Sequence, residues 1–196
     1  MVIVDDFSNA NPSVLGRLES LTGRSIPLHS FDLCDHDKTE HLFAAEDFDA
    51  VIHFAGYKAV GESVEKPLDY YENNLGSTFS LVRAMQKYGV DKLVFSSSAT
   101  VYGTDQAGAT EDRPTFATNP YGWTKVMQEQ ILRDIGAALG RGTAVAAVHK
   151  PGRATDVPVN VLDTSLIRCE MGWASRTGWT EALEATAAWL RGRNAR

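Results

Sequence analysis

The residues best suited to chemistry lie between Lys92 and Lys125. Tyr121 and Lys125 stand four positions apart in a segment typical of a helix, so they project from one face about one turn apart. A free phenol has a pKa near ~10, and a neighbouring ammonium group favours the phenolate and lowers that pKa. The pair therefore predicts a general base that takes a proton from a hydroxyl group near neutral pH.

A run of serines supplies a third chemical group. The apolar strand expected at 92–98 ends in Ser96, Ser97 and Ser98, which places Ser98 at its carboxyl end. Tyrosine and lysine at this spacing also occur on many solvated helices, and a serine run often only caps a strand. These residues alone leave both interpretations open.

Four blocks of sequence around these residues carry a family resemblance. They are Val51–Ser63 (VIHFAGYKAVGES), Tyr70–Asn74 (YYENN), Phe95–Gly103 (FSSSATVYG) and Asn119–Tyr121 (NPY). In order and spacing they resemble the UDP-glucose 4-epimerases of the extended short-chain dehydrogenase/reductase superfamily, over about residues 1 to 135. The resemblance implies an α/β fold with a Rossmann-like doubly wound parallel sheet, NAD as cofactor and a UDP-sugar as substrate.

The resemblance also implies a mechanism. Tyr121 removes the proton from the sugar 4-hydroxyl while C4 gives a hydride to NAD, and the ketose then turns over and receives the hydride on its other face. Lys125 holds the nicotinamide ribose and lowers the pKa of Tyr121, and Ser98 hydrogen-bonds the reacting oxygen. The cofactor does the difficult step and the protein groups orient it.

An acid at the end of the first strand is a candidate for cofactor binding. Residues 1–6 form an apolar run ending in Asp5 and Asp6, which is typical of a buried parallel strand whose carboxyl end faces a ligand. An acid there hydrogen-bonds the adenosine ribose and selects NAD over NADP, so Asp5 is the predicted ribose ligand. The alternative is that both acids simply terminate a strand.

The resemblance adds further cofactor-binding residues. These are Asp6, Asn9, Asp32, Leu33, Phe54, Ala55, Gly56, Lys58 and Asn73, besides Ser98, Tyr121 and Lys125. Several have a structural alternative: Asp32 could cap a helix at 35–45, Lys58 could be a solvated loop residue, and Asn73–Asn74 could lie on a solvated helix stripe. His53 is expected to be a core histidine with its hydrogen bonds satisfied.

The expected elements form a parallel sheet of about five strands with helices on both faces. Strands are predicted at 1–6, 25–32, 48–54, 92–98 and 143–152, and helices at 12–21, 35–45, 67–88 and 119–139. The helix at 67–88 carries an apolar face of Leu68, Tyr71, Leu75, Phe79, Val82 and Met85. In family dimers the helices at 67–88 and 119–139 pair, so the resemblance implies a homodimer.

Two features depart from the family. The sequence contains no G-x-x-G-x-x-G turn of the kind that binds a pyrophosphate, and the resemblance fades after residue 139. We therefore expect an NAD-binding domain at 1–139 that lacks its first strand, a junction at 140–156, and a small carboxyl-terminal appendage at 157–196 as the remnant of a substrate domain. The appendage should hold a short helix with an Asp-x-Ser start and a Gly172-Trp173 stop, and then a helix at 180–190.

Two alternatives to an epimerase stay open: another NAD-dependent sugar-nucleotide dehydratase or reductase, and a non-catalytic remnant. Dehydratases of the superfamily usually carry an Asp-Glu pair after the serine or threonine position. Here Ala99 and Thr100 follow Ser98, which favours an epimerase.

Composition excludes other classes of partner. A net charge of −6 and the lack of a dense basic run disfavour nucleic acid and anionic membranes. No apolar run approaches the roughly 20 residues that span a bilayer, and no zinc-type spacing appears, so we expect no metal. Cys34 and Cys169 form no C-x-x-C pair, which favours a reducing, cytoplasmic setting.

Overall fold

The chain folds into two compact units, Met1–Leu162 and Asp163–Arg196. The computed structural model describes residues 1–103, 106–110, 112–138 and 160–193 of the 196-residue sequence. The junction predicted at 140–156 and the strand predicted at 143–152 lie outside the described residues, so both stay predictions. As expected, the fold is α/β with parallel strand pairing.

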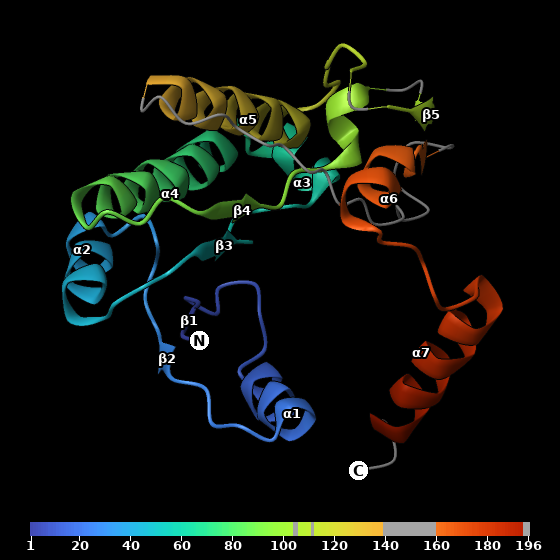
Figure 1. Cartoon of the computed structure of the whole chain (residues 1–196), viewed down its shortest axis with the longest axis horizontal. Helices are drawn as coiled ribbons and strands as arrows, with labels where there is room; N and C mark the ends of the chain where they lie inside the picture. Colours follow the sequence, from blue (N-terminus) through green and yellow to red (C-terminus); the bar gives the residue numbers. More distant parts are fainter. Residues whose placement is uncertain (104–105, 111, 139–159, 194–196) are drawn as a thin grey trace. The chain divides into compact units, whose positions relative to one another are not determined.

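The first unit alternates short strands with helices, as the sequence predicts (Figure 1). Its elements are β1 (Ile3–Val4), α1 (Ser13–Thr22), β2 (Leu28–His29), α2 (His36–Ala45), β3 (Val51–His53), α3 (Val60–Glu65), α4 (Pro67–Lys87), β4 (Leu93–Phe95), the 3₁₀ helix η1 (Ala99–Tyr102), β5 (Gln106–Ala109), α5 (Pro120–Ala138) and β6 (Asn160–Leu162). The four predicted helices are present, whereas the sequence analysis does not predict α3, η1, β5 or β6. The strands are shorter than predicted.

The strands form three separate parallel pairs, β1 with β2, β3 with β4, and β5 with β6. The expectation of one sheet of about five strands is therefore wrong for the described residues. A continuous sheet would need a strand hydrogen-bonded to both β1 and β3, and no described residue provides one. Among the described residues each strand pairs with one other strand, and the strands are two to four residues long.

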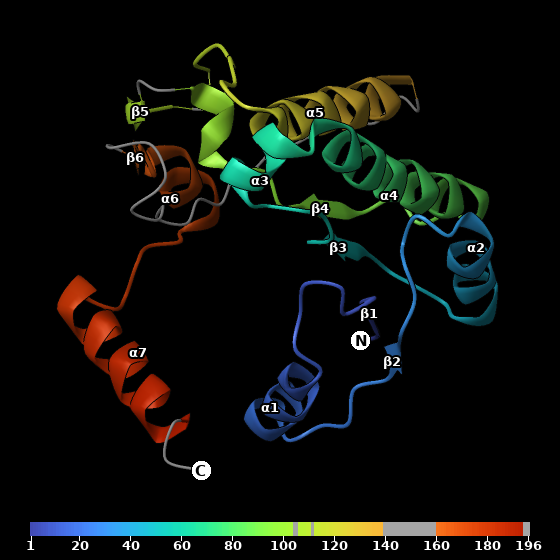
Figure 2. The ribbon, with the colours of Figure 1, turned by 180° about the vertical axis from the view of Figure 1, so that it is seen from behind.

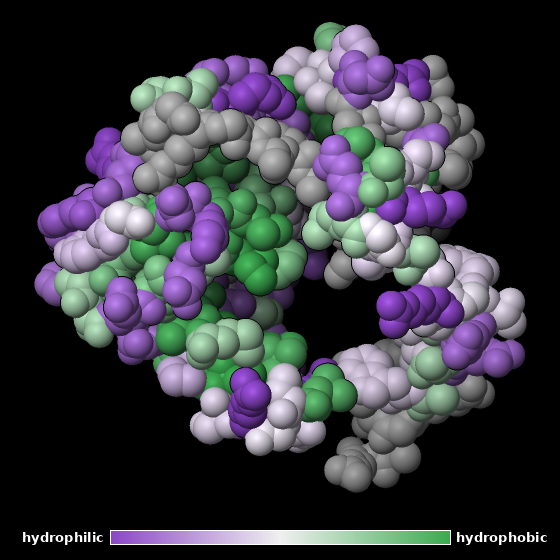
Figure 3. All heavy atoms as spheres, viewed as in Figure 1, coloured by the Kyte–Doolittle hydropathy of each residue, from purple (hydrophilic) through white to green (hydrophobic). Residues whose placement is uncertain are grey.

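Helices α4 and α5 lie side by side and cover one face of the β3–β4 pair (Figures 1 and 2). The other face carries the cross-strand partners Ile52 and Val94, which are 62% and 58% exposed. Figure 3 shows apolar side chains gathered over this region. The prediction of helices on both faces is thus wrong for β3–β4, because no described helix packs on Ile52 and Val94.

The apolar core of this unit forms where α2 and α4 meet. Buried Phe43, Leu81, Ala84, Met85 and Val90 form its centre, and Leu33, Phe48, Val51 and Leu93 pack around them. Pro67 starts α4 at a position where its missing N–H is not needed. Burial of these side chains is the main source of stability for the pair of helices.

The predicted apolar face of α4 is only partly the buried one. Val82 and Met85 are buried, but Leu68 is 64% exposed and Phe79 is 45% exposed. The buried residues of α4 include the polar side chains Asn74, Ser77, Thr78 and Ser80. The apolar periodicity therefore predicts the wrong buried face for α4, because about half of the side chains buried there are polar.

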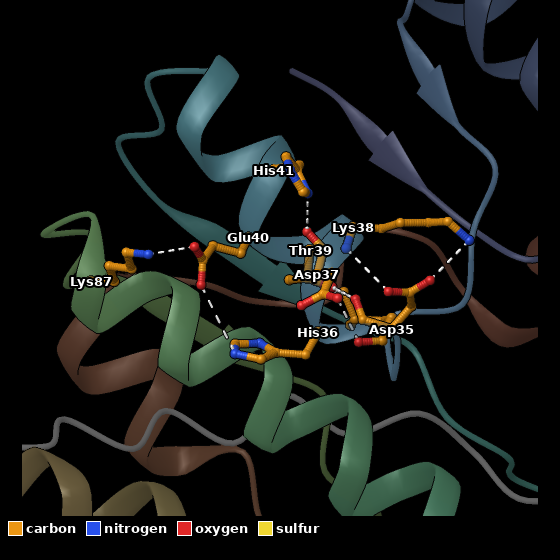
Figure 4. Close-up of polar contacts among 9 residues, drawn as sticks. Asp35, His36, Asp37, Lys38, Thr39, Glu40, His41 and Lys87 are labelled. Atoms are coloured by element: carbon orange, nitrogen blue, oxygen red, sulfur yellow. Dashed lines mark hydrogen bonds and ion pairs between the residues drawn. The ribbon is translucent and has the colours of Figure 1, made fainter.

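Helix α2 begins at an aspartate cap and is joined to α4 by one ion pair (Figure 4). The Asp35 side chain accepts from Lys38 N at 3.1 Å, and its other oxygen lies 2.9 Å from Lys38 Nζ. Glu40 pairs with Lys87 of α4. The alternative role of Asp32 as the cap of this helix is therefore wrong, since Asp35 does that work.

The second unit contains α6 (Ser165–Met171) and α7 (Trp179–Arg193). Asp163 Oδ1 accepts from Ser165 N at 2.7 Å, and Gly172 ends α6 in the left-handed region at φ 62°. The predicted start and stop of this short helix are confirmed. Among the described residues of both units, no helix has the length and apolar character that crossing a membrane requires.

Candidate functional site

Helix α5 brings Lys125 to the end of strand β4, and Tyr121 lies one turn earlier on the same helix. Both side chains are buried, with 5% of Lys125 and 8% of Tyr121 exposed. Lys125 Nζ donates to the carbonyl of Ser96 at 3.0 Å and lies 4.7 Å from the centre of the Phe95 ring. The structure therefore places the predicted lysine against the predicted serine run.

The start of α5 explains why these residues are held firmly. Asn119 Oδ1 accepts from Gly122 N at 2.8 Å, and Pro120 opens the helix. A Cβ on Gly122 would lie 2.9 Å from Ala117 Cβ and 3.2 Å from the carbonyl of Thr100. Gly122 thus permits the close approach of η1, which follows the serine run.

Burial dominates the electrostatics of Lys125. Desolvation lowers the pKa of Lys125 to about 8, and the opposing effect of the Glu129 carboxylate is smaller. Within the described residues Lys125 makes no salt bridge. A buried cation held by a carbonyl and an aromatic ring is unusual for a purely structural lysine and typical of a functional site.

His53 lies behind this lysine as a neutral core residue. It is 2% exposed, and its Nε2 is 3.0 Å from Thr78 Oγ1. Burial, helped by the charge of Lys125, lowers the pKa of His53 to about 4. The expected core position is confirmed, but only one of the two ring nitrogens has a partner among the described residues.

Ser97 and Ser98 make hydrogen bonds to different elements. Ser97 Oγ donates to Glu129, one turn after Lys125 on α5. Ser98 is half-buried and its Oγ accepts from Thr100 N at 3.3 Å and from Thr100 Oγ1 at 2.9 Å. Because Ser98 accepts both bonds, its own hydroxyl proton remains available for a bound oxygen.

The loop after β3 passes close to α4. Phe54 is 72% exposed, and Ala55 and Lys58 are also exposed. Gly56 has φ 140°, and a Cβ there would approach Asn74 Oδ1 to 2.9 Å, so only glycine fits. The loop therefore presents small and exposed residues, as expected for a ligand-facing turn.

Backbone N–H groups two residues later in the chain orient the two acids that follow β1. Asp5 Oδ1 accepts from Phe7 N at 2.8 Å, and Asp6 Oδ1 accepts from Ser8 N at 2.9 Å. Phe7 sits in the left-handed region at φ 58°, which is strained for a bulky residue. Asn9 is exposed in the same turn.

Several predicted cofactor residues gather around Cys34. Asp32 Oδ1 accepts from Cys34 N at 2.8 Å, and Cys34 Sγ donates to the carbonyl of Asn73 at 3.4 Å. Burial, with the charges of Asp32 and Asp6 nearby, raises the pKa of the Cys34 thiol to about 12. Leu33 packs against the apolar core. Asp6, Asp32 and Asn73 thus lie in one neighbourhood.

These residues fit the ribose and nicotinamide portions of NAD. Oδ2 of Asp5 makes no hydrogen bond within the described residues and can accept from a ribose diol. The loop at 54–58, in which Phe54, Ala55 and Lys58 are exposed, and the buried Lys125 offer a surface for the second ribose and its base. The sequence has no glycine-rich phosphate loop, and the described residues contain no cluster suited to a metal ion.

Sequence reasoning missed a buried polar network behind the site. Asn74, Thr124 and Gln128 are each 0% exposed, so the alternative that Asn73–Asn74 lies on a solvated stripe is wrong for Asn74. Thr124 and Gln128 stand four positions apart on α5, as Asn74 and Thr78 do on α4. Paired polar residues at helical spacing were the available signal.

Known proteins share this sequence over most of its length. The pattern of the NAD dependent epimerase/dehydratase family matches residues 1–165. The UDP-glucose 4-epimerase of Bacillus subtilis is 53% identical over 139 residues, which cover 70% of this chain and 41% of that protein. The UDP-glucose 4-epimerase of Mus musculus is 44% identical over 175 residues, covering 82% of this chain and 50% of that protein.

A solved structure shares the fold. The UDP-glucose 4-epimerase from Bifidobacterium longum, in complex with NAD+ and UDP, superposes with a TM-score of 0.68 at 50% identity. The match covers 70% of this chain and 42% of that one. The chain therefore spans less than half the length of that structure.

Proposed function

We propose that this chain, which belongs to the NAD dependent epimerase/dehydratase family, carries the catalytic groups of a UDP-glucose 4-epimerase. Relatives of that name share 53% and 44% identity with it. The reaction would interconvert UDP-galactose and UDP-glucose by transient oxidation at sugar C4. Because the chain spans only part of its relatives, activity, substrate and cofactor are all part of this proposal.

The observation that carries the proposal is the buried Lys125 at the end of β4. Its pKa of about 8 keeps the ammonium protonated at pH 7 while burial has removed most of its water. Tyr121 lies one turn earlier on the same helix and is also buried. A cation that is poorly solvated gains most from a nearby phenolate, so this lysine favours the ionised form of Tyr121.

Each side chain then has a defined task. Tyr121 takes the proton of the sugar 4-hydroxyl and returns it after the sugar has turned over. Ser98 donates its free hydroxyl proton to the same sugar oxygen and stabilises the developing charge. Lys125 is fixed by the Ser96 carbonyl and holds the hydroxyls of the nicotinamide ribose.

NAD, when bound, would supply the hydride chemistry that no side chain can perform. Asp5 would accept from the adenosine ribose, and Asp6, Asn9, Asp32 and Leu33 would surround that end. Phe54, Ala55, Gly56, Lys58 and Asn73 would line the dinucleotide. The gathering of Asp6, Asp32 and Asn73 around Cys34 supports this assignment.

The proposal includes a homodimer formed by α4 and α5. Leu68 and Phe79 on α4 and Met127 on α5 are large apolar side chains that the fold leaves exposed. A pair of packed helices with exposed apolar residues is a suitable surface for a second copy.

The proposal also includes a cytoplasmic location. Cys34 and Cys169 are free thiols, which suits that location.

The test is conversion of the sugar nucleotide itself. Purified protein is incubated with NAD and UDP-galactose, and the UDP-glucose formed is separated by chromatography and quantified. We expect turnover, and we expect Tyr121→Phe to lower it by about 10²–10⁴-fold, because one hydroxyl at the point of proton transfer is gone. Equal turnover in the two proteins, at matched unfolding midpoints, would exclude Tyr121 as the base.

A further inference from the structure

We propose that Asn74 is a positioning residue that couples the cofactor-facing loop after β3 to helix α5. Its single side chain would set both the affinity for NAD and the alignment of Tyr121. The inference rests on the proposed epimerase function and deepens it. It assigns a role to a residue that touches neither the sugar nor the reacting atoms.

One side of the Asn74 amide holds the loop. Asn74 Oδ1 accepts from Tyr57 N at 2.7 Å, and Nδ2 donates to the Tyr57 carbonyl at 3.0 Å. The side chain thus binds both backbone groups of one loop residue, as a neighbouring strand would. The two bonds fix Tyr57 between Gly56 and Lys58, two of the proposed cofactor contacts.

The same amide also holds α5. Nδ2 donates to Thr124 Oγ1 at 2.9 Å, and Thr124 Oγ1 in turn donates to the carbonyl of Tyr121 at 2.7 Å. Both Asn74 and Thr124 are fully buried. A continuous chain of hydrogen bonds therefore runs from the loop backbone, through Asn74, to the backbone of the proposed base.

The orientation of the amide is determined by its partners. Tyr57 N can only donate, so the atom facing it must be Oδ1. Asn73 Nδ2 donates to the same Oδ1 at 3.1 Å. Every hydrogen-bonding position of the Asn74 amide is thereby used, and a flipped amide would place two donors against two donors.

The backbone of Asn74 is fixed as well. Its carbonyl accepts from Gln128 Nε2 at 2.9 Å and from Thr78 Oγ1 at 3.1 Å. Gln128 lies one turn beyond Thr124 on α5, so α5 is attached to Asn74 at two successive turns. These attachments set the rotation of α5 about its axis, and that rotation directs Tyr121 and Lys125.

Removal of the Asn74 side-chain amide should therefore release both the loop after β3 and helix α5. The Tyr57 backbone loses both side-chain partners, and Thr124 loses its donor in a fully buried position. Loosening of the loop should weaken NAD binding, and rotation of α5 should slow turnover. A residue that only supports the fold would change neither property while the protein stays folded.

The experiment compares Asn74→Ala with Thr124→Val and Ser80→Ala. Thr124→Val keeps the side-chain shape and cuts only the branch to α5. Ser80→Ala is the control, since Ser80 is buried in the same helix and its Oγ has no partner among the described residues. All measurements are made at a temperature where every variant is folded.

The first readout needs no cofactor. Hydrogen exchange of the Tyr57 amide, followed by NMR, should be at least tenfold faster in Asn74→Ala and unchanged in Ser80→Ala. Equal exchange in these two variants would overturn the attachment. This result stands whether or not the protein proves to be an epimerase.

The second readout separates the two branches. Asn74→Ala should raise the Kd for NAD and lower kcat, whereas Thr124→Val should lower kcat and raise the Kd by a smaller factor, because the Tyr57 backbone stays held. If Asn74→Ala releases the Tyr57 amide but Kd and kcat stay as in the parent protein, the coupling is refuted while the proposed function holds. If the parent protein neither binds NAD nor turns over, the proposed function fails instead, and the exchange result alone decides the attachment.

Discussion

Helix α1 has no buried residue, whereas α4 buries one face along most of its length and contacts α2, α3 and α5. Both helices cross over between parallel strands, and both have clear stop signals in Gly23 and Gly89. They differ in what lies against them. The first region, β1 with α1, contains the proposed ribose ligand Asp5. The second region, formed by α4 and α5, contains the proposed base Tyr121.

The two regions also use hydrogen bonds differently. Asp5 and Asp6 accept from backbone N–H groups two residues away, so their positions depend on one local turn. Asn74 and Gln128 bind residues about 50 positions away in a buried network. Local turns open at low free energy and buried networks do not, so the proposed catalytic groups should be much more rigid than the ribose ligand.

The largest difference is expected from matched leucine substitutions. Leu81→Ala opens a cavity in the core formed with Phe43 and Met85, and should lower the free energy of unfolding by about 2–5 kcal/mol. Leu21→Ala on α1 removes a side chain that is 83% exposed and should change it by less than about 0.5 kcal/mol. Urea unfolding followed by circular dichroism measures both. Similar effects for the two variants would show that α1 is packed as tightly as α4.

Much of this contrast could be read from the sequence, but not all of it. Pro67, Asn119–Pro120 and Gly172 mark helix ends through local geometry, so the helices were predicted to within a few residues. The spacing of Tyr121 and Lys125, and their place against the serine run, also follows from local periodicity. These features depend on neighbours in the chain, which the sequence displays directly.

Other features depend on partners far away in the sequence. Ile52 was expected to be covered on its face of the sheet, and it is exposed because that face has no described partner. The sequence leaves a solvated position for Asn74 open, because polarity alone does not reveal a buried amide with four hydrogen bonds. Helix α3 has only six residues, which is too short for a helical periodicity to predict it.

A second test measures how the free energy of unfolding changes as the pH is lowered. The pKa of His53 is lowered from 6.5 to about 4, so the unfolded chain binds one proton more than the folded chain between these values. The contribution of His53 to stability is therefore complete above pH 6.5 and is lost as pH falls toward 4, by about 3 kcal/mol in total. His53→Gln should flatten this part of the curve of unfolding free energy against pH. A curve of equal slope in both proteins would show that His53 is hydrated in the folded state.

The central claim is that residues of both regions form one NAD site, and calorimetric titration of NAD into the purified protein tests it most directly. We expect saturable binding that is weakened both by Asp5→Ala, in the segment of β1, and by Lys125→Met, in α5. Leu21→Ala should leave it unchanged, since that side chain is exposed and is not one of the proposed contacts. Absence of binding in the parent protein, or equal binding in all four proteins, would contradict the account.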